Sequence, residues 1–315
     1  MLIIEESVLR ARVREPAALA AAERAFRALA DGRVSVPAPM HLTVPDALGE
    51  VHVKAAAIRG SEVFAVKVAS GFYENPGRGL PSGSGLMLVF DAETGFPVGL
   101  LRDNGYLTDL RTGAAGALAV RELAPERFAR VAVIGSGAQA RYQLRAMAQV
   151  RRWEETRVWS PRPEHVRRCC EELERELDGR VEGAATVAAA VRGADLVVTV
   201  TPSTQPLVYA GWLEPHATVI AVGSDGPAKQ ELALDVLLRA DRVIADSLAQ
   251  CLRLGELHHA EVAGVLPKVR VTGELGDVVV GRIPGRTGDE LIVCDLTGVG
   301  AQDAAVAEAA WKLAR

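Results

Sequence analysis

Residues 130–140 have the sequence RVAVIGSGAQA, and this stretch decides the fold class. Its first half is the short apolar segment typical of a buried parallel strand. Gly135, Gly137 and Ala140 follow as G-x-G-x-x-A at the start of a helical segment. In this setting the first glycine permits a tight turn, the second lets the backbone approach a pyrophosphate, and the alanine allows the helix to pack closely. Because a helix N-terminus attracts phosphate, the motif predicts a dinucleotide-binding unit.

Short apolar segments alternate with helical ones along this part of the chain. The expected strands are 130–137, 156–160, 194–201, 217–224, 241–247 and 290–298. Apolar strands joined by helices predict a parallel sheet covered on both faces, which is a Rossmann-type α/β fold. The residues expected to hold the cofactor are Gly135, Ser136, Gly137, Ala138, Gln139, Thr112, Ser160, Arg162, Thr201, Gly223 and Ser224.

Ser160 stands at the end of the second strand, where an NAD-selective site usually has an acidic residue for the ribose 2′-hydroxyl. Arg162 follows two residues later. A hydroxyl and a guanidinium accept a 2′-phosphate that an acidic group would repel, so the sequence favours NADP over NAD. The alternative is that Arg162 is only a solvated charge at a helix start.

The N-terminal third of the chain has a different pattern. An amphipathic helix is expected at 16–31, and Gly/Pro turns then separate strands expected at 51–58, 63–70, 86–91 and 97–101. This order predicts an α+β domain with an antiparallel sheet. A last helix at 301–314 has the spacing to pack back onto it. We therefore expect one domain over 1–115 with 300–315, and a dinucleotide-binding domain over 116–299.

Lys54 and Lys67, two of only five lysines, lie inside apolar strands. Strand alternation places Lys67 on the same face as Val63, Ala65 and Ala69. A lysine buried without a partner is costly, and lysines in such positions often bind an anion or transfer a proton. The alternative, which is stronger for Lys54, is an edge-strand lysine whose charged end reaches solvent.

Arg111 and Asp225 are the other candidate active-site residues. Arg111 precedes an Ala-rich helix, where its charge opposes the helix dipole and suits an anionic ligand better. Asp225 follows the expected strand 217–224. A residue just beyond the carboxyl end of a parallel strand faces the ligand crevice. The alternative for Asp225 is a helix N-cap.

Several protein classes are not expected. The formal net charge of −4 and the lack of a basic stripe argue against a nucleic-acid partner. The sequence contains no run of about 18 apolar residues, so no membrane span is expected. The N-terminus lacks the pattern of a signal peptide, and we therefore expect a cytoplasmic protein. The four cysteines form no C-x-x-C pair, and adjacent His258 and His259 point apart on a helix. The sequence therefore predicts no metal site.

Together these residues resemble the ornithine cyclodeaminase/mu-crystallin family over nearly the whole chain. The similarity is carried by VKVASGFYENPGRGLPSGSGLMLVFDAETG, NGYLTDLRTGAAGA, GSGAQAR, AVGSDGPAKQEL, DSLAQCLRLGELHHA and CDLTGVGAQD. Among its branches, the proteins of ectoine utilisation look closest. The resemblance implies a homodimer built through the first domain and a small amino- or imino-acid substrate.

The resemblance also implies roles for individual residues. The lysine and arginine that match Lys67 and Arg111 bind the substrate α-carboxylate, and the residue that matches Ser82 is a hydroxyl neighbour in that pocket. The aspartate that matches Asp225 is the acid/base for the amino-group proton. Family chemistries are cyclodeamination, ketimine reduction and amino-acid dehydrogenation, which share hydride exchange at the α-carbon.

Two positions depart from the cyclodeaminase pattern. An arginine expected within 37–42 is absent, and His41 is the nearest substitute for it in substrate binding. Lys54 occupies a position that is acidic in the ornithine enzyme. Both changes argue against ornithine, because a second positive charge near the pocket repels its ammonium group and attracts a second carboxylate.

Three functions remain open from the sequence. In an NAD(P)H-dependent imine reductase or amino-acid dehydrogenase, the cofactor exchanges a hydride with the α-carbon while Asp225 manages the nitrogen proton. In an ornithine cyclodeaminase-type enzyme, bound NAD⁺ is reduced and reoxidised within one cycle. The third is a non-enzymatic binding protein, which the presence of Lys67, Arg111 and Asp225 disfavours. NADPH suits net reduction, so the sequence favours the reductase.

Overall fold

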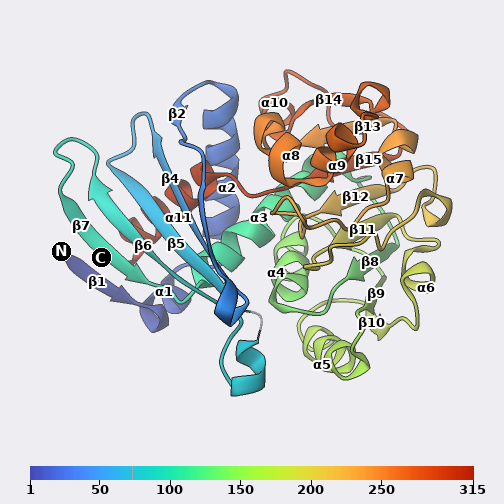
Figure 1. The fold of residues 1–315 in the computed structure, drawn as a ribbon, viewed down its shortest axis with the longest axis horizontal. Coiled ribbons are helices and arrows are strands. Elements are labelled where there is room, and N and C mark those ends of the chain that lie inside the picture. Colours follow the sequence, from blue (N-terminus) through green and yellow to red (C-terminus); the bar gives the residue numbers. More distant parts are fainter. Residues whose placement is uncertain (73) are drawn as a thin grey trace. The chain divides into compact units, whose positions relative to one another are not determined.

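The computed structural model describes residues 1–72 and 74–315. The chain forms two compact units (Figure 1). Unit 1 contains Met1–Arg111 and Val299–Arg315, and unit 2 contains Thr112–Gly298. Helix α3 (Tyr106–Leu123) spans the boundary in sequence. No helix within the described residues is both long and apolar enough to cross a membrane.

Unit 1 is built on a seven-stranded sheet with the order β1-β7-β6-β5-β4-β2, and β3 also pairs with β4. Strand β1 is parallel to β7, and the other neighbours are antiparallel. The strands are β1 (Leu2–Glu5), β2 (Val34–Ser35), β3 (Met40–Val44), β4 (Gly49–Ile58), β5 (Val63–Phe72), β6 (Gly83–Asp91) and β7 (Pro97–Arg102). Its helices are α1 (Glu6–Arg12), α2 (Glu15–Ala30), α11 (Gly300–Ala314) and the 3-10 turns η1 (Pro45–Ala47) and η2 (Asn75–Arg78).

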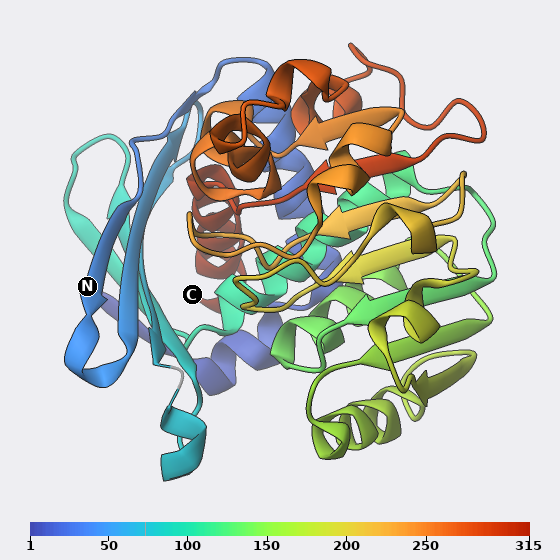
Figure 2. The same cartoon turned by 45° about the vertical axis from the view of Figure 1, so that its right-hand side comes forward.

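Helix α11 covers one face of this sheet, and α2 packs on α11 (Figure 2). Successive side chains along each strand point to opposite faces of the sheet. Most of those on the helix-covered face are buried, and most of those on the opposite face are half-buried. The buried set is Ala56, Ile58, Val63, Ala65, Met87, Val89 and Leu101. Alanines on both helices allow close packing, and α11 returns onto the first unit as the sequence predicts.

The opposite face of the sheet in unit 1 is apolar. Its side chains, which are half-buried, are Val51, Val53, Phe64, Val66, Val68, Leu86, Leu88, Phe90, Val98 and Leu100. Phe64 and Phe90 stack on this face with their ring centroids 5.0 Å apart. Among the described residues of unit 1, no helix packs on it. We call this set the outer sheet face.

Unit 2 is an eight-stranded, wholly parallel sheet with the order β10-β9-β8-β11-β12-β15-β13-β14. The strands are β8 (Arg130–Ile134), β9 (Glu155–Trp159), β10 (Arg180–Gly183), β11 (Leu196–Thr199), β12 (Thr218–Ala221), β13 (Arg242–Ala245), β14 (Val271–Glu274) and β15 (Ile292–Asp295). The helices are α4 (Ala138–Met147), α5 (Pro163–Leu173), α6 (Val187–Val191), α7 (Leu234–Arg239), α8 (Leu248–Leu254), α9 (Glu256–Val262), α10 (Leu275–Val279), η3 (Ala210–Trp212) and η4 (Leu266–Lys268).

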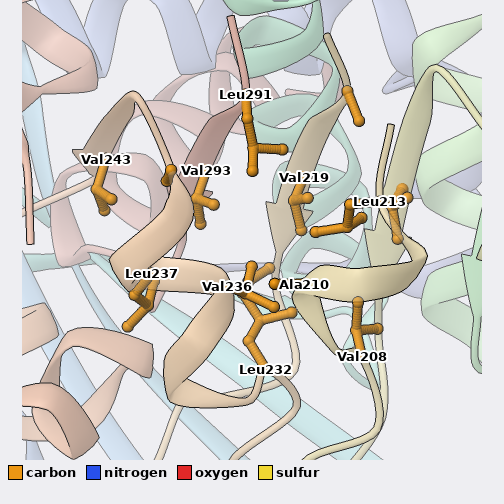
Figure 3. Packing of buried hydrophobic residues seen from close by; sticks show 14 of the residues in the cluster. Val208, Ala210, Leu213, Val219, Leu232, Val236, Leu237, Val243, Leu291 and Val293 are labelled. Atoms are coloured by element: carbon orange, nitrogen blue, oxygen red, sulfur yellow. The ribbon is translucent and has the colours of Figure 1, made fainter. Parts of the chain in front are cut away.

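The strands of unit 2 are short and apolar because both faces of the sheet are covered. Figure 3 shows one side of this core, where Val219, Val243 and Val293 of neighbouring strands meet Val236 and Leu237 of α7. The doubly covered parallel sheet confirms the predicted fold class. Its order reverses between β8 and β11, which is the position where ligands bind in open parallel sheets.

Candidate active site

A buried cluster of charged side chains lies in unit 1 where β4 and β5 meet α11. Lys54 and Lys67 pair directly across the two strands and are only 7% and 2% exposed. Both lie on the helix-covered face, so the predicted burial of these lysines is confirmed. Like charges placed directly opposite on neighbouring strands destabilise a sheet. Such a pair needs a compensating anion.

Asp303 of α11 supplies part of that compensation. The Lys67 Nζ atom lies 3.0 Å from each of its carboxylate oxygens. The Arg111 Nε atom lies 2.9 Å from Oδ1 of the same group. Gln302 accepts a 3.3 Å hydrogen bond from Arg111 Nη1. The strand lysine and the helix arginine are thus brought together, and the aspartate that joins them was missed by the sequence analysis.

The charges of this cluster do not balance. Burial would raise the pKa of Asp303, but Arg111 and Lys67 outweigh burial and hold that pKa below its usual value. Burial lowers the pKa of Lys67 to about 7; Arg111 and Lys54 add to this effect, and Asp303 opposes it. Two cations, Lys67 and Arg111, therefore contact one ionised carboxylate, that of Asp303. A carboxylate ligand would neutralise the excess.

Arg111 does not lie at the start of its helix, which corrects the sequence interpretation. Helix α3 begins at Tyr106, so Arg111 is in its second turn. The buried Asp103 accepts a 2.8 Å hydrogen bond from the Leu107 N–H through Oδ2 and so helps to start the helix early. The helix-dipole argument for Arg111 therefore fails, and its contact with Asp303 replaces it.

The glycine turn between β8 and α4 has the geometry that a dinucleotide requires. Gly135 has φ +121°, and a Cβ there would lie 2.8 Å from the Val200 side chain. Gly137 is the N-cap of α4 and offers no side-chain cap to the first amides of the helix. A Cβ at Gly137 would meet no described atom within 4 Å, so the turn is open at this position. The turn therefore fits a pyrophosphate, which would accept hydrogen bonds from the α4 amides.

Ser160 follows the carboxyl end of β9 and ties it to the glycine turn. Its hydroxyl lies 2.7 Å from that of Ser136. Arg162 is exposed at the N-cap of α5. Beside Ser160 is a cavity of about 490 Å³ that is bordered by α5 along its length and by β10, and its lining includes Arg167 and Glu171. No acidic side chain replaces Ser160 at the strand end.

The buried Glu231 accepts hydrogen bonds from several segments of unit 2, and the sequence analysis did not identify it. It accepts hydrogen bonds from the Thr201 hydroxyl at 2.8 Å, the Thr199 hydroxyl at 2.7 Å and the Gly223 N–H at 2.8 Å. Two predicted cofactor residues, Thr201 and Gly223, are therefore held by one side chain. Burial raises the pKa of Glu231 to about 7, although these hydrogen bonds oppose the effect. The only sequence signal was an acidic residue beside the apolar Leu232.

Asp225 lies in the loop after β12, as predicted, and its carboxylate is 44% exposed. Its Oδ1 atom lies 2.7 Å from Lys229 Nζ. Helix α7 begins only at Leu234, after an N-cap at Ala233. The alternative interpretation of Asp225 as a helix cap is therefore wrong. Ser224 donates a 2.6 Å hydrogen bond to the Lys229 carbonyl, which fixes the loop on both sides of Asp225.

Two further predicted residues lie elsewhere in unit 1. Ser82 is exposed just beyond the β5–β6 ladder, which ends where Gly71 pairs with Gly83. Lys67 pairs with Met87 in the middle of the same ladder, so these strands do not bring Ser82 to the cluster. His41 of β3 lies 3.2 Å from Glu50, through its Nε2 atom.

A comparison with known protein families gives a match over nearly the whole chain. The model of the ornithine cyclodeaminase/mu-crystallin family matches residues 2–313. The chain belongs to this family. A putative dehydrogenase of Rhizobium meliloti is 45% identical over 99% of this chain and 95% of its own length. The iminosuccinate reductase of Paracoccus denitrificans is 33% identical over 100% of this chain and 97% of its own length.

Solved structures of relatives in the ornithine cyclodeaminase/mu-crystallin family share the whole fold. The Thermococcus litoralis Δ¹-pyrroline-2-carboxylate reductase, in complex with NADH and L-proline, has a TM-score of 0.95 at 29% identity and covers 100% of this chain and 97% of that one. An archaeal alanine dehydrogenase dimer with bound NAD has a TM-score of 0.91 at 32% identity. The match covers 100% of this chain and 96% of the dehydrogenase chain.

The buried Glu231 of this family member gives a prediction about stability and pH. Its pKa is raised in the folded state, so the folded protein holds a proton that the unfolded chain has lost between about pH 4.5 and 7. The stability that protonation of Glu231 gives the folded protein is fully present below pH 4.5. The free energy of unfolding then falls by about 3 kcal/mol as the pH rises to 7. Glu231→Gln should flatten this slope in urea unfolding measured across that range.

The control for this prediction is Glu62→Gln, because Glu62 is an exposed acid of unit 1. This variant should keep the wild-type dependence of unfolding free energy on pH. An unchanged slope in Glu231→Gln would show that Glu231 remains ionised in the folded protein.

Proposed function

We propose that this protein is an NAD(P)H-dependent imine reductase or amino-acid dehydrogenase that exchanges a hydride with the α-carbon of a small imino or amino acid. The buried Lys67–Asp303–Arg111 cluster, with cations in excess, carries the proposal because it suits a substrate α-carboxylate. The glycine turn of unit 2 supports the dinucleotide. The named activities of the relatives, reduction or oxidation at C=N and CH–NH bonds, support the reaction class.

Each residue has a separate task in this proposal. The bound nicotinamide supplies or accepts the hydride. Lys67 and Arg111 hold the substrate carboxylate and so orient the α-carbon. Asp225 hydrogen-bonds the substrate nitrogen and moves its proton, while Lys229 keeps the carboxylate oriented. The amides at the start of α4 bind the pyrophosphate.

Lys54 favours a dicarboxylate substrate. It pairs across β4–β5 with Lys67 and adds a second buried positive charge to the α-carboxylate site. This charge would bind a second carboxylate, as in iminosuccinate, and would repel a side-chain ammonium. The similarity to the Paracoccus iminosuccinate reductase supports the same substrate class.

Lys54→Met tests this role. The variant removes the buried charge and keeps the apolar stem, so it changes the electrostatics of the site with little change in packing. The KM for a dicarboxylate should rise at least tenfold, while the KM for a monocarboxylate imine changes little. Equal changes for both substrates, measured with one cofactor, would contradict a role for Lys54 in selecting the second carboxylate.

For the cofactor, we propose a preference for NADP(H) because Ser160 replaces the usual acid and Arg162 is near. Arg162→Ala should weaken NADPH binding by about 1–3 kcal/mol and leave NADH binding unchanged, since a charge-assisted contact to the 2′-phosphate is lost. Fluorescence titration with both cofactors measures this. Arg167→Ala, in the neighbouring cavity wall, distinguishes the two guanidiniums. Wild-type protein that binds NADH as tightly as NADPH would contradict the preference.

The reaction itself is tested by turnover assays with NADPH and NADH against keto acids with amines, cyclic imines and ornithine. We expect net oxidation of the reduced cofactor with an imine formed from a dicarboxylate keto acid. Ammonia release from ornithine with catalytic NAD⁺ and no net cofactor change would instead identify a cyclodeaminase.

We also propose that the protein is a homodimer formed through the outer sheet face of unit 1. That face is continuous and apolar, and the archaeal alanine dehydrogenase, with which the chain shares its fold, is described as a dimer. A large apolar face that remains partly accessible marks an interaction surface. Light scattering of wild type and of Val66→Asp tests this, and the variant should be a folded monomer or a weaker dimer. A monomeric wild type would contradict it.

A further inference from the structure

Three side chains with metal-ligating atoms converge on the hairpin formed by β3 and β4. His41 of β3 pairs directly with His52 of β4, and Glu50 precedes His52 by two residues on the same strand face. All their ligating atoms lie within 4.8 Å of one another. The sequence analysis missed this group because the two histidines belong to different strands and have no metal-ligand spacing along the chain.

The distances are those of a compact coordination site. The Nε2 atoms of His41 and His52 lie 3.2 Å and 3.3 Å from the same oxygen, Oε2 of Glu50. Zinc binds nitrogen and carboxylate oxygen at about 2.0–2.2 Å in a tetrahedron, which separates neighbouring ligand atoms by about 3.3 Å. A small movement of the side chains would therefore admit the ion between them.

The arrangement of the rings also suits a shared ligand. The two imidazoles stack with centroids 4.6 Å apart and an angle of 19° between planes, and both Nε2 atoms contact the same Glu50 oxygen. The side chains are 40%, 19% and 21% exposed for His41, Glu50 and His52. An ion would thus reach the site from solvent and keep one coordination position open.

We propose that His41, Glu50 and His52 form a binding site for one divalent transition-metal ion, with zinc as the reference ion. Two imidazoles and one carboxylate select such ions over calcium and magnesium, which prefer oxygen ligands. The site would lie on the same sheet face as Lys54, two residues beyond His52 on β4. In this assignment His41 is a metal ligand and does not itself replace a carboxylate-binding arginine.

The test is calorimetric titration of tag-free, chelator-treated full-length protein with zinc sulfate at pH 7.5. We expect one ion per chain with a Kd in the micromolar range or tighter. His41→Ala, His52→Ala and Glu50→Gln should each weaken binding at least tenfold. Cobalt(II) should give the intense visible absorption of a four-coordinate ion in wild type, and this absorption should be lost in His52→Ala.

His165→Ala is the matched control, because His165 is also an exposed histidine beside a glutamate, Glu164, at 3.9 Å. Zinc binding should be unchanged in this variant, and circular dichroism of the ligand variants should match wild type. If wild type binds no zinc, or if binding persists in His52→Ala, the contacts at Glu50 are hydrogen bonds only and the proposal is overturned. None of these readouts depends on oxidoreductase activity.

Discussion

Replacing Asp225 with asparagine should lower kcat by about 10²–10⁴, the usual scale of general acid–base catalysis. Asparagine keeps the shape and one acceptor oxygen but cannot carry the proton that the substrate nitrogen gains or loses. The carboxylate lies in the loop after β12, fixed by Lys229 and 44% exposed, so it is available to a ligand. The measurement is kcat over pH for both proteins, with cofactor affinity determined in parallel.

Asp235→Asn is the matched control for this substitution. Asp235 lies in α7 of the same unit and accepts a 3.2 Å hydrogen bond from Ala210 N–H, a role that an asparagine oxygen also fills. This variant should keep kcat and its pH profile. If Asp225→Asn retains more than about a tenth of the activity with the wild-type profile, the acid/base lies elsewhere, with Lys67 as the next candidate.

Lys67→Met should lower kcat/KM by about 10²–10⁴, because it removes a buried cation that we assign to the substrate carboxylate and leaves Asp303 paired with Arg111 alone. Cofactor affinity should change little, since the glycine turn belongs to unit 2. In wild type, kcat/KM should fall as pH rises through about 7, where Lys67 loses its charge. Steady-state kinetics over pH, with fluorescence titration of the cofactor, measure all three effects.

Lys312→Met provides the comparison for that result. Lys312 is a half-exposed lysine near the end of α11 and pairs with Glu308 at 2.8 Å. Its substitution removes a lysine ion pair on the same helix without touching the cluster, so kcat/KM should stay at the wild-type value. Near-wild-type kcat/KM in Lys67→Met would show that Lys67 serves only the packing of strand and helix.

Local patterns explain which parts of the fold could be predicted. The G-x-G-x-x-A turn, β8 and α4 follow from eleven adjacent residues, 130–140. The apolar strands β11, β12 and β15 were found in the same way. The missed strands were β1, β2, β3, β10 and β14, which are short or carry polar residues because they lie toward sheet edges or in a hairpin.

The candidate site could be predicted only in part, because some of its residues come together only in the folded structure. Lys54 and Lys67 stand out because charges inside apolar strands break a local rule. Asp303 could not be found this way, since it lies 236 residues from Lys67 and only tertiary packing joins them. Glu231 and the His41–His52 pair are hidden for the same reason. Sequence periodicity gives the face of an element, whereas contacts between distant elements need the folded structure.

The discontinuity of unit 1 has a consequence for how the chain is made. Unit 2 is one uninterrupted segment, so it can fold on the ribosome as soon as Gly298 has emerged. Unit 1 must wait for α11, which is synthesised after all of unit 2, and until then its strands lack both the helix that packs on them and the counter-charge to Lys67. In the nascent chain, the sheet of unit 1 is therefore incomplete, and Lys54 and Lys67, which are buried in the folded protein, are exposed. A ribosome-stalled chain that ends before Gly300 should display protease sensitivity in unit 1 while unit 2 is already protected.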